Sequence, residues 1–226
     1  MNLKIVFLVL FIAAASAKSA SKLVEKFAWN VLDYAYPDQA TKQHALNTGE
    51  FIPQNGIPVG IEVWRDKLFV TVPRWRKGIP STLNYVNLRN NYNKSPALIP
   101  YPDWRTNKEG NCEGVTTTYR IKADACDRLW VLDSGTLGIE NTTQQLCPYG
   151  ILVYDLHTDR LIRRYNFKPE DTNPQTFIAN IAVDIGKTCD DTFVYASDEL
   201  GHGLLVYSWA ENTSWRVEHG FFLQTL

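Results

Sequence analysis

Asp133 and Asp198 are the residues of this chain whose type and position best fit acid–base chemistry. Each closes an apolar stretch of similar composition, and the two stretches begin at Leu129 and Phe193. Two carboxylates at one site can exchange a proton with a substrate or attract a cationic amine. A carboxylate at the end of a strand can instead accept hydrogen bonds from nearby backbone N–H groups. We therefore consider Asp133 and Asp198 as candidate catalytic residues, with local capping as the alternative.

Other catalytic patterns are missing from the sequence. It contains no G-x-S-x-G, H-E-x-x-H, P-loop or G-x-G-x-x-G motif, which are the common signatures of hydrolases, metalloproteases and nucleotide-binding proteins. Ser134 fits a strand-end turn better than a nucleophile. Asp198-Glu-x-x-His202 is a local grouping of metal-ligand residue types, but a second histidine ligand is missing and a polar turn explains it better. We expect no metal site and no cofactor.

The apolar stretches belong to a unit that occurs three times. Each copy has an apolar strand, a short polar turn carrying aspartate and a second apolar strand, and the copies are 60–75, 119–135 and 181–198. The second strands begin at Leu68, Leu129 and Phe193, at intervals of 61 and 64 residues. A nearly fixed period of this kind is the sequence signature of a repeat architecture.

A second hairpin is expected after each copy. Its strands are rich in Val, Leu, Tyr and Trp, as strands are, and they are expected at 83–88, 151–156, 161–165, 204–209 and 215–217. Four-stranded antiparallel sheets repeated around an axis form a β-propeller, so we predict an all-β chain with about three blades. The first blade should be incomplete at its outer edge, because residues 90–100 are polar and contain proline. Residues 22–34 fit a short helix or an outer strand.

The N-terminus has the features of a secretory signal peptide. Lys4 precedes an apolar run, and an Ala-Ser-Ala site follows, so cleavage is predicted after Ala17. Residues 18–226 would then form a partial propeller that is secreted and has no membrane contact. The formal net charge is −1, and the short basic run 74–77 is interpreted as a solvated loop, so nucleic acid is not an expected partner.

Four cysteines and three sequons fit an extracellular protein. The cysteines permit three disulfide connectivities, but the blade topology places Cys112 with Cys147 at one rim and Cys126 with Cys189 at the other. We predict these two bridges, because bridged Cα atoms must lie within about 7 Å. The N-x-[ST] sequons at Asn93, Asn141 and Asn212 all fall in expected loops and are candidate glycosylation sites.

Several long motifs resemble the insect yellow / major royal jelly protein family, and its yellow branch in particular. The motifs are 51–60, 68–83, 98–104, 126–135, 147–149 and 171–184, and the resemblance extends from about Lys22 to about Phe222. It implies a secreted six-bladed propeller with a role in insect cuticle pigmentation and melanin formation. Family members continue through further blades, so the resemblance also implies that this chain is C-terminally truncated, as an N-terminal half.

Three functions follow from the resemblance. The first is a binding or structural protein of the pigment pathway, which we prefer because no catalytic constellation is visible and a fold alone does not imply catalysis. The second is a dopachrome-converting enzyme of tautomerase type, with Asp133 and Asp198 as acid–base groups. The third is a salivary or haemolymph protein that binds a biogenic amine. The expected ligand is a small catechol or amine, and the exposed blade edges of a partial propeller should favour self-association.

Overall fold

The computed structural model describes residues 23–89 and 94–223. The predicted signal peptide, residues 1–17, and the sequon at Asn93 lie outside these ranges. No helix within them is long and apolar enough to cross a membrane.

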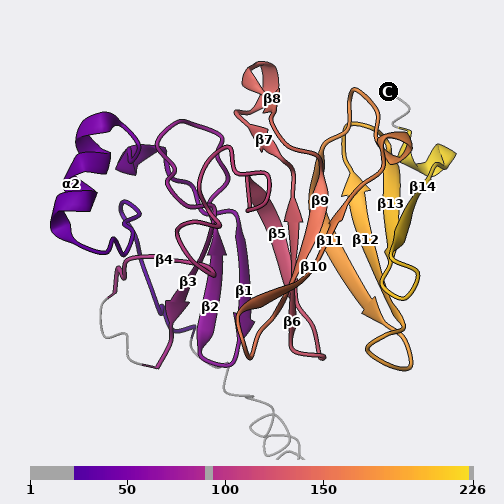
Figure 1. Cartoon of the computed structure of the whole chain (residues 1–226), viewed down its shortest axis with the longest axis horizontal. Helices are drawn as coiled ribbons and strands as arrows, with labels where there is room; N and C mark the ends of the chain where they lie inside the picture. Colours follow the sequence, from indigo (N-terminus) through magenta and orange to yellow (C-terminus); the bar gives the residue numbers. More distant parts are fainter. Residues whose placement is uncertain (1–22, 90–93, 224–226) are drawn as a thin grey trace, which may run out of the picture.

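Three four-stranded antiparallel sheets stand side by side along the molecule (Figure 1). We number them in chain order. Sheet I contains β1 (Gly60–Trp64), β2 (Lys67–Thr71), β3 (Leu83–Asn87) and β4 (Ile99–Pro100). Sheet II contains β5 (Thr118–Ala123), β6 (Arg128–Asp133), β9 (Gly150–Asp155) and β10 (Arg160–Asn166). Sheet III contains β11 (Ile178–Ile185), β12 (Thr192–Asp198), β13 (Gly203–Ser208) and β14 (Thr213–Val217). The all-β class and the four-stranded antiparallel repeat are therefore as predicted.

Short elements connect and extend the sheets. A small hairpin of β7 (Thr136–Leu137) and β8 (Gln144–Gln145) projects beyond sheet II in Figure 1. Four single-turn 3-10 helices are described: η1 (Pro53–Asn55), η2 (Glu140–Thr142), η3 (Pro169–Asp171) and η4 (Gly220–Phe222). Asn141 was expected in a loop, and this projecting hairpin was not predicted from the sequence.

Tight turns set the register of the hairpins. Trp64 pairs with Lys67 across a two-residue turn, and Arg65 adopts φ 51° there. Asp127, Asp159 and Asn212 occupy corresponding left-handed positions in other turns, with φ between 50° and 56°. Asn and Asp tolerate this backbone region better than most residues. In these four turns the polar residue therefore also sets the backbone conformation of the turn.

Alternating side chains pack each sheet against the next. Sheet I contributes Phe69 and Tyr85 to a core shared with Leu129 and Leu152 of sheet II. The opposite side of sheet II forms a second core with sheet III, in which Trp130 is fully buried. Because successive strand residues point to opposite faces, a sheet has one face toward the preceding part of the chain and one toward the following part; in sheet II a neighbouring sheet covers each of them. We call these its back face and its front face.

The N-terminal segment covers the back face of sheet I. Leu32, Tyr34 and Phe51 pack there against Val70 and Val86. Tyr34 also forms a parallel bridge with Leu98, next to β4. The two-residue length of β4 agrees with the expectation that the outer edge of this sheet is incomplete.

A helix that was not predicted from the sequence follows this segment. Residues 22–34 were expected as a short helix or an outer strand, but residues 23–33 form neither, and α2 spans Gln39–Thr48. The Asp38 side chain caps its first turn by accepting from the Thr41 N–H, and Gly49 ends it at φ 77°. Only Ala45 of α2 is buried. The sequence of this helix therefore has almost no apolar periodicity from which the helix could be predicted.

The structure contains the two disulfides that the sequence predicts. Cys112–Cys147 ties the loop before sheet II to the segment after β8, with Cα atoms 5.4 Å apart. Cys126–Cys189 joins equivalent hairpin turns of sheets II and III, with Cα atoms 5.9 Å apart. The second bridge links neighbouring sheets covalently.

Candidate functional site

The second strands of sheets II and III end at the two candidate carboxylates. Asp133 ends β6 and pairs with Gly150, and Asp198 ends β12 and pairs with Gly203. The repeat therefore places the two residues at equivalent ends of neighbouring sheets. Both are 3% exposed, so neither presents its carboxylate openly to a solvent-borne substrate.

Asp133 binds backbone amides. One carboxylate oxygen accepts from the N–H groups of Thr117 and Gly135, at 2.9 and 3.0 Å, and the other accepts from the Thr116 N–H at 2.9 Å. Burial raises the pKa of Asp133, while these three N–H groups and the charge of Arg164 act in the opposite direction. Asp133 therefore joins the segment before β5 to the segment after β6. This is the local capping role that the sequence offered as the alternative to catalysis.

Asp198 combines backbone contacts with an ion pair. It accepts from the N–H groups of Phe177 and Gly201 and from the Thr176 hydroxyl, at 2.8 to 2.9 Å. The Arg216 guanidinium lies 2.8 Å away. Burial acts to raise the pKa of Asp198, but Arg216 and the other donors hold it below its ordinary value. A carboxylate held in this way has little freedom to act as a base or a metal ligand.

Arg74 corrects the interpretation of the basic run 74–77 as a solvated loop. Arg76 and Lys77 are exposed, but Arg74 is only 2% exposed. Its guanidinium donates to backbone carbonyl groups of Ile79, Pro80, Asn107, Val115 and Thr116. Burial lowers the pKa of Arg74, and the charges of Glu109 and Asp133 oppose that effect. Arg74 thus ties sheet I to the segment that Asp133 holds from the other side.

Three aromatic rings meet beside these strand ends. The Trp75 indole N–H donates to the Tyr119 hydroxyl at 2.9 Å, and the ring of Tyr119 makes an edge contact with Phe177 at 5.3 Å between centroids. The rings come from the segment after β2, from β5 and from the residue before β11, so each sheet supplies one. Trp75 and Phe177 are half-buried. We call Trp75, Tyr119 and Phe177 the aromatic triad.

A polar chain lies next to the aromatic triad. Glu199 accepts from the Asn180 side-chain amide at 2.6 Å, and the Arg120 guanidinium donates to the Asn180 oxygen at 3.3 Å. The Glu199 backbone N–H also donates to the Phe177 carbonyl at 2.9 Å. Burial raises the pKa of Tyr119, and the Glu199 charge adds to this effect. Aromatic faces beside an exposed carboxylate are suited to a small aromatic or cationic ligand.

The metal interpretation of Asp198-Glu-x-x-His202 has no support in its contacts. Asp198 and Glu199 have the partners given above, and His202 sits in a turn at φ 56°. Across residues 23–89 and 94–223, no group of three or more His, Cys, Asp or Glu side chains is arranged to hold a metal ion.

Two of the three sequons lie in the described ranges, both in exposed turns. Asn141 belongs to η2, at the tip between β7 and β8. Asn212 belongs to the β13–β14 turn, where its Oδ1 atom accepts from the Tyr207 hydroxyl at 2.9 Å. Both positions leave room for a glycan.

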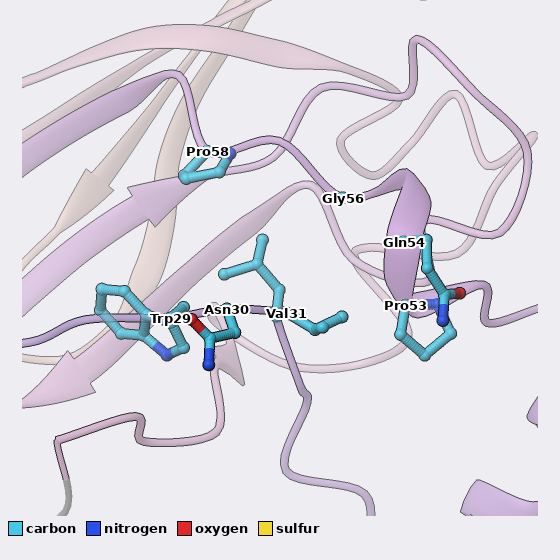
Figure 2. A pocket seen from close by; sticks show the side chains of 8 residues that line it. Trp29, Asn30, Val31, Pro53, Gln54, Gly56 and Pro58 are labelled. Carbon is cyan, nitrogen blue, oxygen red and sulfur yellow. The ribbon is translucent and has the colours of Figure 1, made fainter.

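A separate cavity lies on the far side of sheet I from sheet II. It measures about 290 Å³, and Figure 2 shows Trp29, Val31 and Pro53 around it, with the Gln54 amide at its edge. The Trp29 indole N–H is already bonded to the Pro96 carbonyl at 2.8 Å. The cavity has no charged lining residue, so it offers no acid–base chemistry.

Comparison with known proteins identifies relatives for this chain. Residues 116–225 match the family model described as major royal jelly protein. Protein yellow of Drosophila yakuba is 56% identical over 219 residues, which are 96% of this chain and 40% of the relative. Protein yellow of Drosophila erecta is 58% identical over 206 residues, covering 90% of this chain and 38% of the relative. The Drosophila melanogaster protein is 57% identical with the same coverage. The chain thus spans about two fifths of the length of these relatives.

A solved structure also matches, more distantly. The catalytic domain of the Coprinopsis cinerea GH62 α-L-arabinofuranosidase aligns with 83% of this chain and 54% of its own, at a TM-score of 0.34 and 12% identity. That similarity is too low to support an argument about fold or activity.

Proposed function

This chain is a relative of the yellow proteins and carries a major royal jelly protein domain, and from that premise we propose that it is a secreted binding protein of an insect pigment pathway. The identity of more than half of its residues to several yellow proteins supports the pathway. Two disulfides and two exposed sequons support an oxidising, extracellular location.

The proposed architecture is part of a β-propeller. The three sheets stack front face to back face, and their first strands, β1, β5 and β11, are neighbours. First strands that lie side by side line the axis of a propeller. The family's six-bladed ring is the arrangement to which these sheets would belong.

Binding is preferred to catalysis because both candidate carboxylates have structural hydrogen bonds. Asp133 and Asp198 are buried and hydrogen-bonded to the turns beside them. Trp75 and Phe177 are half-buried, whereas Tyr119 between them is 3% exposed, so these two outer rings of the aromatic triad, with the exposed Glu199 beside them, are the better surface for a ligand. Its chemistry fits a small catechol or a biogenic amine, because the rings can stack on an aromatic ligand and the carboxylate can pair with an ammonium group.

Calorimetry with dopamine tests this proposal. Saturable binding is expected, and Glu199→Gln should weaken it about 10-fold, as for loss of one partly exposed ion pair. Glu211→Gln, in an exposed turn of the same sheet, is the matched control and should leave binding unchanged. Absence of binding, or equal binding by both variants, would overturn the assignment of the site.

Conversion of dopachrome is the second candidate function. Burial raises the pKa of Asp133, which is the direction that an acid catalyst needs. Loss of dopachrome absorbance in the presence of the protein would establish turnover. If turnover appears and Asp133→Asn abolishes it without unfolding the chain, the protein is an enzyme and the binding proposal is too narrow.

A further inference from the structure

Two oppositely charged side chains flank the Asn180 amide beside the aromatic triad. The Arg120 Nε atom donates to Asn180 Oδ1 at 3.3 Å, and Asn180 Nδ2 donates to Glu199 Oε1 at 2.6 Å. One amide group therefore separates a guanidinium from a carboxylate. All three residues are exposed, and they come from β5, from β11 and from the turn after β12.

Both charged groups can make further hydrogen bonds. Arg120 uses its Nε atom for Asn180 and its Nη1 atom for the Val59 carbonyl, and a guanidinium has more N–H donors than these two contacts use. Glu199 accepts from Asn180 through Oε1, and an ionised carboxylate can accept several more bonds. Neither side chain forms an ion pair with another residue of 23–89 or 94–223. The two charges are therefore available to a ligand that carries both opposite charges.

A β-bulge in each first strand aims these side chains at the site. The register of β5 with β6 shifts across Tyr119 and Arg120, and the register of β11 with β12 shifts just before Asn180. Bulges of this kind re-aim side chains and are frequent next to active sites. Although Tyr119 and Arg120 are consecutive, Tyr119 contacts both other rings of the aromatic triad, while Arg120 contacts Asn180 and Val59, which precedes β1. Both side chains thus reach toward sheet I and sheet III.

The aromatic surface adjoins this charged pair. The Glu199 backbone N–H donates to the Phe177 carbonyl at 2.9 Å, and Arg120 follows Tyr119 directly in β5. Trp75 and Phe177 are half-buried, so part of each ring is open to a ligand. A ligand that stacks on these rings therefore meets a guanidinium and a carboxylate beside them.

An α-amino acid carries the complementary groups. At neutral pH its carboxylate and its ammonium group are both ionised. They are attached to one carbon atom, so they can meet a guanidinium and a carboxylate that a single amide separates. Arginine binds carboxylates through paired N–H donors. An amine without a carboxylate would instead leave Arg120 unpaired near a second positive charge, which lowers affinity.

We propose that this site binds an aromatic α-amino acid in its zwitterionic form. Arg120 pairs with the α-carboxylate, Glu199 pairs with the α-ammonium group, and Trp75 and Phe177 contact the aromatic ring. Asn180 is a positioning residue that holds the two charged side chains apart. This inference deepens the ligand-binding function proposed above and rests on it, because it names the class of ligand for the same site.

Calorimetry with two catechol ligands tests the proposal. L-dopa differs from dopamine by one carboxylate, and the wild-type chain should bind L-dopa about 10-fold more tightly, as for one added charge-assisted contact. Arg120→Gln should reduce this preference to about one. Arg160→Gln is the matched control, because Arg160 is an exposed arginine of β10, at the opposite edge of sheet II. This control should keep the 10-fold preference.

The outcomes separate this inference from the function on which it rests. If wild type binds dopamine as tightly as L-dopa, or more tightly, the amino-acid inference is wrong while the aromatic binding site stands. The same preference in Arg120→Gln as in wild type would also overturn it. If neither ligand binds, the proposed binding function fails together with this inference. The comparison on the wild-type chain does not depend on whether any variant folds.

Discussion

Sheets II and III end their second strands with the same residue, yet they accommodate its charge differently. Asp133 in sheet II is satisfied by three backbone N–H groups and forms no ion pair with any residue in the part of the chain that the structure describes. Asp198 in sheet III is bonded to two backbone N–H groups, a hydroxyl and the Arg216 guanidinium. The pKa of Asp133 is raised and the pKa of Asp198 is lowered. Equivalent positions in a repeat can therefore have the same structural role and opposite electrostatics.

The difference follows from the neighbouring segments. In sheet III the outer strand β14 supplies Arg216, which also donates to the Gly201 carbonyl at 2.5 Å. In sheet II the corresponding turn approaches Arg74, which donates to the Thr116 carbonyl while Asp133 accepts from the Thr117 N–H of the same peptide group. The two buried charges at that site are thus joined through a peptide group and not by direct contact. Capping by Asp is repeated, whereas the nearby cation comes from sheet III itself at Asp198 and from the segment after β2 of sheet I at Asp133.

Among the changes that test this comparison, removing an arginine near each aspartate should lower the free energy of unfolding the most. Arg216→Met leaves Asp198 buried without its cation, and we expect the free energy of unfolding to fall by about 3 kcal/mol. Arg164→Met in sheet II is the matched change. Arg164 donates to the Glu113 and Gly114 carbonyls and not to Asp133, so a loss of about 1 kcal/mol is expected. Urea unfolding of both variants provides the measurement, and equal losses would contradict the distinction between the two sites.

The sequence predicted the shared features of these sites but not their difference. The repeat located both aspartates, the hairpins and the turns joined by Cys126–Cys189, because those depend on short-range patterns of apolar and turn residues. Arg74 was assigned to a solvated loop because its burial depends on carbonyl groups from residues 79–116, which only the folded chain brings together. The aromatic triad was missed for the same reason, since each ring comes from a different sheet.

The response to pH should have opposite signs at the two aspartates. For Asp198 the folded-state pKa lies below the ordinary value of about 4, so the stability it contributes is present above pH 4 and is lost as the pH falls through the folded-state pKa. For Asp133 the folded-state pKa is raised, so its protonated form favours folding and stability is lost as the pH rises from about 4 through that pKa.

Asparagine variants isolate these two contributions. The difference in unfolding free energy between wild type and Asp198→Asn should grow as the pH rises from about 3 to 5, whereas the difference for Asp133→Asn should shrink as the pH rises above about 4. Urea midpoints measured at a series of pH values give both curves. Two curves with the same slope would show that the electrostatics of the strand ends are alike.

Hydroxyl groups beside each carboxylate give the smallest and most local comparison. The Thr176 hydroxyl donates to Asp198 at 2.8 Å, whereas the Thr117 hydroxyl is buried without a hydrogen-bond partner among the described residues. Thr176→Val removes a bond to an ionised group and should lower stability by about 1.5 kcal/mol. Thr117→Val removes an unsatisfied polar atom and should be neutral or slightly stabilising. Both changes conserve shape, so thermal denaturation of the pair separates hydrogen bonding from packing. If Thr117→Val is the more damaging change, the Thr117 hydroxyl has a partner in solution, and the backbone cap of Asp133 is then only part of a larger polar network in sheet II.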